Sequence, residues 1–155
     1  MYRVENMLRV LFGYGAAVLA TYVACVLLIS QTNLSNIIAM GGIVDASIRF
    51  DAVWHDLSHM YLYLLMVAVS FAIALPAATW VIRWLPDLRL IGYVLAGFVG
   101  LVVIHIVLKA SFGGSIIAPT RTIMGLLAQG LAGAIGGYLF HRITRVTVLP
   151  GNPDV

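Results

Sequence analysis

Four long apolar segments constrain this chain more than any other feature of its sequence. They cover residues 8–29, 57–82, 90–108 and 123–140. Each reaches or approaches the roughly 20 residues that a helix needs to cross a hydrocarbon core of about 30 Å. None shows the polar alternation that is typical of a membrane strand. The segments predict an all-α integral membrane protein, a four-transmembrane-helix bundle that forms a single domain over residues 1–155.

The composition indicates that lipid is the solvent of this chain. Hydrophobic residues make up 62% of the sequence and charged residues only 10%, whereas soluble domains carry about 25% charged residues. A soluble fold of this length could not bury so much apolar surface, so the lipid bilayer is the first expected partner. The basic residues stand singly between apolar runs. That pattern is typical of membrane topology, and we expect no nucleic-acid partner.

The basic residues also predict an orientation. Six arginines flank the apolar segments on one side, and three basic residues flank them on the other. Because positively charged residues stay in the cytoplasm, both termini should be cytoplasmic, and the expected location of this multi-pass protein is a bacterial inner membrane. The six are Arg3, Arg9, Arg83, Arg89, Arg142 and Arg145, and the three are Arg49, Lys109 and Arg121.

The stretches outside the four segments differ in character. Residues 30–56 are too apolar for a free loop, so an interfacial helical segment is expected between the first and second spans. Residues 148–155 are expected to form a disordered tail. Aromatic residues near the segment ends predict belts at the two membrane boundaries. They are Trp54, Tyr61 and Tyr63 on the outer side and Trp80 and Trp84 on the inner side.

Three possible metal ligands stand at steps of four residues where the second predicted span begins. Asp51, His55 and His59 drift by only about 40° per step around a helix, so they share one face. Such spacing can present ligands to a single transition-metal ion. The plain alternative is a polar network in which the histidines bond to one another, to acids or to the backbone.

His105 offers a second interpretation of the same region. Antiparallel second and third spans would hold His59 and His105 at a similar depth below the outer boundary. Two histidines on facing helices can ligate a b-type haem. Lys109 and Arg121 would then lie near the rim, where they could pair with propionates or another anion. Haem b and a transition-metal ion are therefore the two candidate cofactors.

Small residues in the fourth span predict a packing interface. Gly133 and Gly137 form a GxxxG pair, and Gly130 and Ala134 repeat the spacing one face over. Small residues let helix backbones approach closely in lipid. The interface can lie within this chain's own bundle or dock another chain. Gln129 lies among these residues and needs a hydrogen-bond partner.

The sequence lacks a recognisable catalytic set. It contains no GxSxG, no Walker A motif and no paired carboxylates within a span. The favoured function is therefore a non-enzymatic membrane subunit or helper that packs against a membrane protein partner or against itself. The alternative is a haem- or metal-holding anchor for electron transfer. A weaker alternative is a small homo-oligomeric transporter or channel.

Overall fold

The computed structural model describes residues 2–113 and 118–145, and within them every regular element is helical. The all-α prediction is confirmed, and four of these helices are long and apolar enough to cross a membrane. The tail predicted at residues 148–155 lies outside the described residues. The long helices are α1 (Tyr2–Ala39), α3 (Tyr61–Ile82), α4 (Arg89–Phe112) and α5 (Ile123–Thr144). A shorter helix, α2 (Ala46–His59), and two 3-10 turns, η1 (Pro86–Leu88) and η2 (Ala118–Arg121), complete the described elements.

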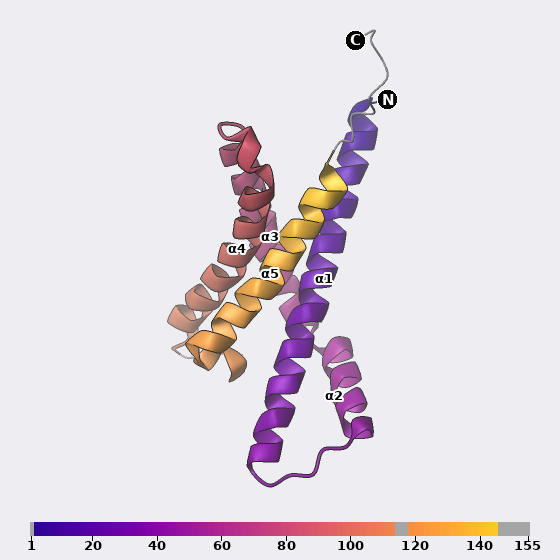
Figure 1. The fold of residues 1–155 in the computed structure, drawn as a ribbon, viewed down its shortest axis with the longest axis vertical. Helices are drawn as coiled ribbons and strands as arrows, with labels where there is room; N and C mark the ends of the chain where they lie inside the picture. Colours follow the sequence, from indigo (N-terminus) through magenta and orange to yellow (C-terminus); the bar gives the residue numbers. More distant parts are fainter. Residues whose placement is uncertain (1, 114–117, 146–155) are drawn as a thin grey trace.

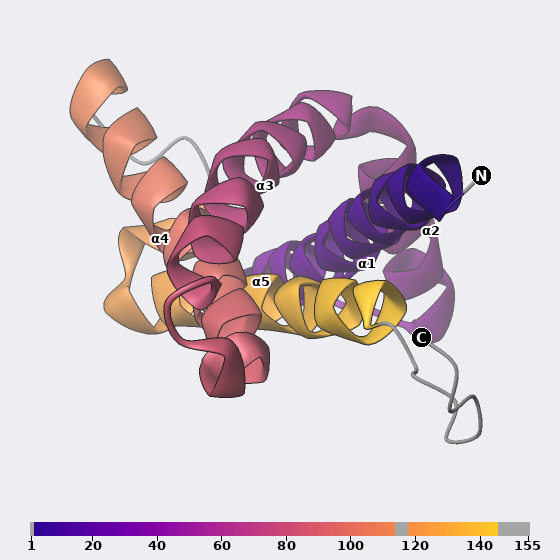
Figure 2. The ribbon, with the colours of Figure 1, turned by 90° about the horizontal axis from the view of Figure 1, so that it is seen from above.

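The long helices form a bundle in which α5 is central. Helix α5 packs against α1 on one side and α4 on the other, and α3 packs against α4 (Figures 1 and 2). Helix α2 lies beside the second half of α1 (Figure 1). The beginning of α1 meets the end of α5, where Gly13 approaches the side chains of Ile143 and Thr144. The chain therefore begins its first helix and ends its last helix at the same end of the bundle.

Helix α1 ends ten residues later than the predicted span, which ended at Ile29. The sequence becomes polar there, but it contains no helix breaker before Gly41. The hydroxyls of Thr32 and Ser35 donate to carbonyls one turn back, at 2.7 and 2.8 Å, so they do not compete with the helix. The chain leaves the helix only near Gly41, whose φ of 89° favours glycine. Glycine, and not the loss of apolar residues, therefore determines where this helix ends.

The segment between the first two spans is helical, as predicted, but it ends later than expected. Helix α2 begins at the N-cap Asp45, whose carboxylate accepts from the Ile48 N–H at 2.9 Å and the Ser47 hydroxyl at 2.8 Å. These bonds lower the pKa of the Asp45 carboxyl, the Ile48 bond most. The helix continues to His59, so residues 57–59 belong to α2 and not to the second span.

A break at Met60 separates α2 from α3. Its φ of −84° and ψ of 39° are not helical. No glycine or proline announces this break in the sequence. Tyr22 of α1 compensates for part of it, because its hydroxyl donates to the Leu57 carbonyl at 2.8 Å. That carbonyl lies in the last turn of α2, where helix carbonyls lack partners in the next turn.

The predicted glycine interface is occupied by the chain's own helices. Cβ atoms added at Gly133 and Gly137 would overlap the backbone carbonyls of Gly97 and Tyr93 on α4. Gly130 faces the side chain of Phe98, also on α4. Ala134, the remaining predicted member, is only half-buried. Backbone contact between α4 and α5 therefore uses this surface, and it is not free for another chain.

Replacing Gly97 by alanine should destabilise the bundle. The added methyl group would overlap the Gly133 carbonyl, and backbone atoms cannot move aside cheaply. Overpacking of this kind typically costs about 1–3 kcal/mol. We expect unfolding at lower denaturant in an SDS titration of the purified protein in mild detergent.

Gly15→Ala is the matched control, because a Cβ at Gly15 would meet no atom within 4 Å. Alanine should leave the stability unchanged or raise it by up to about 1 kcal/mol, since glycine is a poor helix former. If Gly97→Ala and the unaltered protein unfolded at the same SDS concentration, the close α4–α5 contact would be contradicted.

Candidate functional site

A buried polar cluster takes one side chain from each of the four long helices. We call Cys25, Tyr63, His105 and Gln129 the polar cluster; they come from α1, α3, α4 and α5 in turn. At most 6% of the surface of each residue is exposed. The Cys25 side chain lies close to Tyr63. Because buried polar groups are costly unless paired, their gathering at one place is the most informative feature of the interior.

Tyr63 is the centre of this cluster. Its hydroxyl oxygen lies 2.9 Å from Oε1 of Gln129 and 3.4 Å from Nε2 of His105. The other ring nitrogen of His105, Nδ1, lies 2.6 Å from the Leu101 carbonyl. A carbonyl can only accept, so Nδ1 carries the hydrogen and Nε2 is the acceptor of the neutral ring. Tyr63 has one proton for two acceptors, and the shorter distance favours Gln129.

The amide of Gln129 has a second possible orientation. As placed, its Nε2 is buried and lacks a hydrogen-bond partner in the described part of the chain. Exchanging its oxygen and nitrogen would let the amide donate to Tyr63 and let Tyr63 donate to His105. Both orientations link α3 and α5 by a hydrogen bond between Tyr63 and Gln129. The second orientation also links α4, because Tyr63 then donates to His105. The hydrogen bonds of the cluster therefore hold α3 against α4 and α5.

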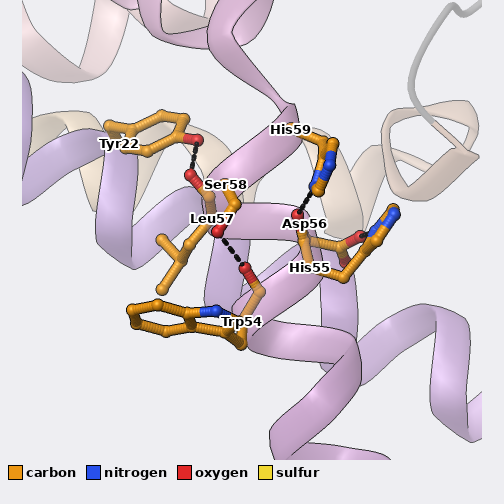
Figure 3. Close-up of polar contacts among 7 residues, drawn as sticks. All are labelled: Tyr22, Trp54, His55, Asp56, Leu57, Ser58 and His59. Atoms are coloured by element: carbon orange, nitrogen blue, oxygen red, sulfur yellow. Dashed lines mark hydrogen bonds and ion pairs between the residues drawn. The ribbon is translucent and has the colours of Figure 1, made fainter.

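The histidines of α2 make local contacts (Figure 3). His59 donates from Nδ1 to the His55 carbonyl one turn back, at 2.8 Å. The two imidazole rings stack with centroids 4.2 Å apart and planes inclined by 17°. His55 is 68% exposed, and its Nδ1 lies 3.6 Å from Oδ1 of Asp56. The i, i+4 spacing thus stacks the rings along one face of α2.

The structure does not assemble the predicted metal site. Asp51 is exposed, and the acid that pairs with His55 is Asp56. Across residues 2–113 and 118–145, no three histidine, cysteine, aspartate or glutamate side chains come together as metal ligands. The rings of His55 and His59 instead stack on each other, and the acid beside His55 is Asp56. The set of Asp51, His55 and His59 has no geometric support here.

The two predicted haem ligands lie in different elements and environments. His59 is exposed at the end of α2, whereas His105 is buried in the bundle. The break at Met60 places His59 in α2, so it is not on the span that was predicted to carry it beside His105. Lys109 and Arg121 are both exposed, and their place at the rim of a site stays a prediction.

Sequence reasoning identified His105 and Gln129 but missed Tyr63. It assigned Tyr63 to an aromatic belt with Trp54 and Tyr61, which are 65% and 70% exposed, but Tyr63 is 5% exposed. A signal was available, because Tyr63 is the next residue in the i, i+4 series after His59. Cys25, the remaining member of the cluster, is fully buried.

Comparison with known proteins does not assign a family. No family model, curated protein or solved structure matches the chain. Function must therefore be argued from the side chains and surfaces themselves.

Tyr63→Phe should weaken the hydrogen-bonded link between α3 and α5. It removes the donor to Gln129 while keeping the ring that packs near Tyr22 and His105. Hydrogen bonds between membrane helices contribute about 0.6 kcal/mol on average and up to about 1.7 kcal/mol. We expect a loss of that size in the free energy of unfolding, measured by SDS titration.

Tyr61→Phe serves as the control. It removes a hydroxyl at an exposed position two residues before Tyr63. It should change the stability little. A double-mutant cycle with Gln129→Leu should show that the two losses are not additive. Additive losses would mean that the Tyr63–Gln129 bond contributes nothing.

Proposed function

We propose that this chain is an integral protein of the bacterial inner membrane and works without catalysis, as a subunit or helper that packs against another membrane protein. Its four long helices are apolar enough to span a bilayer. Large apolar side chains remain exposed along α1, α3 and α4. Such surface suits lipid or another transmembrane helix, and one part of it has the shape of a docking site.

The observation that carries the proposal is an apolar furrow between α3 and α4, which we call the α3–α4 furrow. It has a volume of about 620 Å³. Its rims follow steps of four residues along the two helices. Its floor is made of small residues. The rims include Ile73, Ala77 and Val81 on α3 and Leu95, Val99 and Val103 on α4; the floor includes Ala74, Ala78, Ala96 and Gly100.

Close packing of the two helices creates this shape. A Cβ at Gly100 would come within 2.9 Å of Cβ of Ala74 and 3.0 Å of the Ser70 hydroxyl oxygen. Near the other end, a Cβ at Gly92 would come within 2.9 Å of the Ile82 side chain. These contacts draw the helix axes together, so the more exposed residues beside them, most of them larger, form the rims.

A helix is the occupant that best matches the α3–α4 furrow. Helices pack by fitting ridges of side chains into grooves, and rows spaced by four residues are the commonest ridges. Small residues at the floor permit close approach in lipid, where apolar surface alone gives no driving force. The fourth-span glycines are already used inside the chain, so the furrow is the surface that we assign to the partner helix.

The other two functions have less support. An electron-transfer anchor needs His59 and His105 to face each other, and one is exposed while the other is buried. A channel or transporter needs polar groups available to its cargo. The Tyr63 hydroxyl of the polar cluster is instead bonded to Gln129 of a neighbouring helix.

A photo-crosslinking amino acid at Val99 tests the proposed partner. Val99 is 49% exposed on the rim of the furrow, and Leu131 of α5, which is 61% exposed, offers a control outside it. In the native membrane, Val99 should give one discrete protein adduct that Leu131 does not give. Ala77→Leu, at an exposed position on the rim, should reduce that adduct at least fivefold while the protein stays folded.

The outcomes separate three cases. An adduct at Val99 that Ala77→Leu removes supports a partner helix in the furrow. An adduct only of twice this chain's mass, together with a symmetric oligomer in mild detergent, would replace the partner by self-association. Lipid adducts alone at both positions would overturn the docking role of the furrow.

The proposed topology predicts the sides of two reporter fusions. Alkaline phosphatase inserted at Gly42, between α1 and α2, should be active because it lies outside the cytoplasm. A green fluorescent protein at the C-terminus should fluoresce because that end stays inside. The six arginines at the end of the bundle that contains the start of α1 motivate this orientation. The reverse pattern of activity would overturn it.

A further inference from the structure

A second apolar opening lies between α1 and α3, and we call it the α1–α3 fissure. It has a volume of about 930 Å³, within the range of roughly 300–1,000 Å³ that is usual for small-molecule sites. Met7, Val10 and Leu11 form one wall on α1, and Leu75 and Pro76 lie on the α3 wall. The fissure is separate from both the α3–α4 furrow and the polar cluster.

The two ends of the α1–α3 fissure differ chemically. At the end that lies deeper in the bundle, the Tyr14 hydroxyl donates to the Ala68 carbonyl at 2.6 Å and joins α1 to α3. Phe71 and Phe140 line the fissure near this closed end. Beyond this bond, α1 presents flexible apolar side chains and α3 presents Ala72, which is too small to fill the space. The hydrogen bond therefore closes the fissure at one end, and apolar side chains line it beyond that bond.

The open end carries the polar lining. Asn6 near the start of α1 and Arg83 at the end of α3 lie there, and Trp80 lies one turn before Arg83. Arg83 is exposed, and none of the ion pairs found among the described residues involves it. Its guanidinium is therefore available to a ligand, with an indole ring beside it that suits a membrane boundary.

The surrounding charge favours an anion at this end of the bundle. The start of α1, the α3–α4 turn and the end of α5 meet here. They carry an excess of positive charge. Their charged residues are Arg3, Arg9, Arg83, Arg89, Arg142 and Arg145 against Glu5 and Asp87. The α1–α3 fissure, with its apolar walls and its cationic open end, therefore matches an amphiphile that has an apolar chain and an anionic head group.

We propose that the α1–α3 fissure binds an anionic phospholipid. One acyl chain lies along the apolar walls toward Tyr14, and the phosphate pairs with Arg83 and Asn6 at the open end. The proposal assumes the membrane placement proposed above but does not depend on a partner helix. It assigns a lipid of defined charge to one side of the bundle.

Quenching of Trp80 by brominated lipids tests the site. In a Trp54→Phe, Trp84→Phe background, Trp80 is the remaining tryptophan and it lines the fissure. The protein is reconstituted into vesicles with equal mole fractions of dibrominated phosphatidylglycerol or dibrominated phosphatidylcholine. One arginine near the membrane surface contributes about 1 kcal/mol toward anionic lipid. Phosphatidylglycerol should therefore compete for the site roughly fivefold better.

Two variants locate the head and the chain. Arg83→Gln should abolish the preference for phosphatidylglycerol. Arg142→Gln should retain it, because Arg142 is at the same end but bonds to the Tyr138 hydroxyl at 3.0 Å and does not line the fissure. Ala72→Phe should fill the fissure and reduce quenching by both lipids, with folding verified by circular dichroism. Excess glycerol phosphate should not displace the lipid, since the acyl chain supplies part of the binding.

Each other outcome contradicts the proposal. Equal quenching by the two lipids, or a preference that survives Arg83→Gln, would show that Arg83 does not recognise the head. Equal loss in Arg142→Gln would indicate general surface charge. Unchanged quenching in Ala72→Phe would place the chain elsewhere, and displacement by glycerol phosphate would indicate an ion site. Protein that fails to float with the vesicles would overturn the membrane placement as well.

Discussion

Backbone contact between α4 and α5 is the interaction on which the rest of the structure depends. Gly97 and Gly133 leave no room for a side chain at the crossing, and Gly137 meets the Tyr93 carbonyl in the same way. In lipid, apolar side chains gain little by leaving one apolar surface for another, so close packing must supply the association. Gly136 extends the same principle to α1, because it faces the Ala17 carbonyl and the Thr21 hydroxyl.

This crossing also positions the polar cluster. With α5 held against α4, Gln129 and His105 both lie within hydrogen-bonding reach of Tyr63. Tyr63 then determines where α3 begins, just after the break at Met60. The glycines provide proximity without specificity, because they carry no polar group that would favour one helix register. The hydrogen bonds provide specificity, because a change in register would leave Gln129 buried without Tyr63.

The sequence predicts the number and type of the long helices because long apolar runs with few charges can be read from it directly. It predicts their ends less well, since these depend on capping and breakers; α1 continues past Ile29 to the glycines after Ala39. The break at Met60 has no local signature. It depends on contacts such as the bond from Tyr22 to Leu57, which join residues 35 positions apart. The same break leaves His59 in α2, outside α3, the helix that packs against α4 and its His105.

The distribution of contacts along α3 explains why both proposed sites use this helix. Its first half is bonded to two other helices, through Tyr63 to Gln129 and through the Ala68 carbonyl to Tyr14. Its second half follows α4, where Thr79 lies 3.2 Å from the Tyr93 hydroxyl. The α1–α3 fissure opens past the last bond to α1, and the α3–α4 furrow follows the surface where α3 and α4 converge. Pro76 lies in the second half of α3. It has no backbone N–H, so it cannot donate a hydrogen bond to the Ala72 carbonyl one turn back. Helix α3 is therefore fixed where it begins and least enclosed where it lines both surfaces.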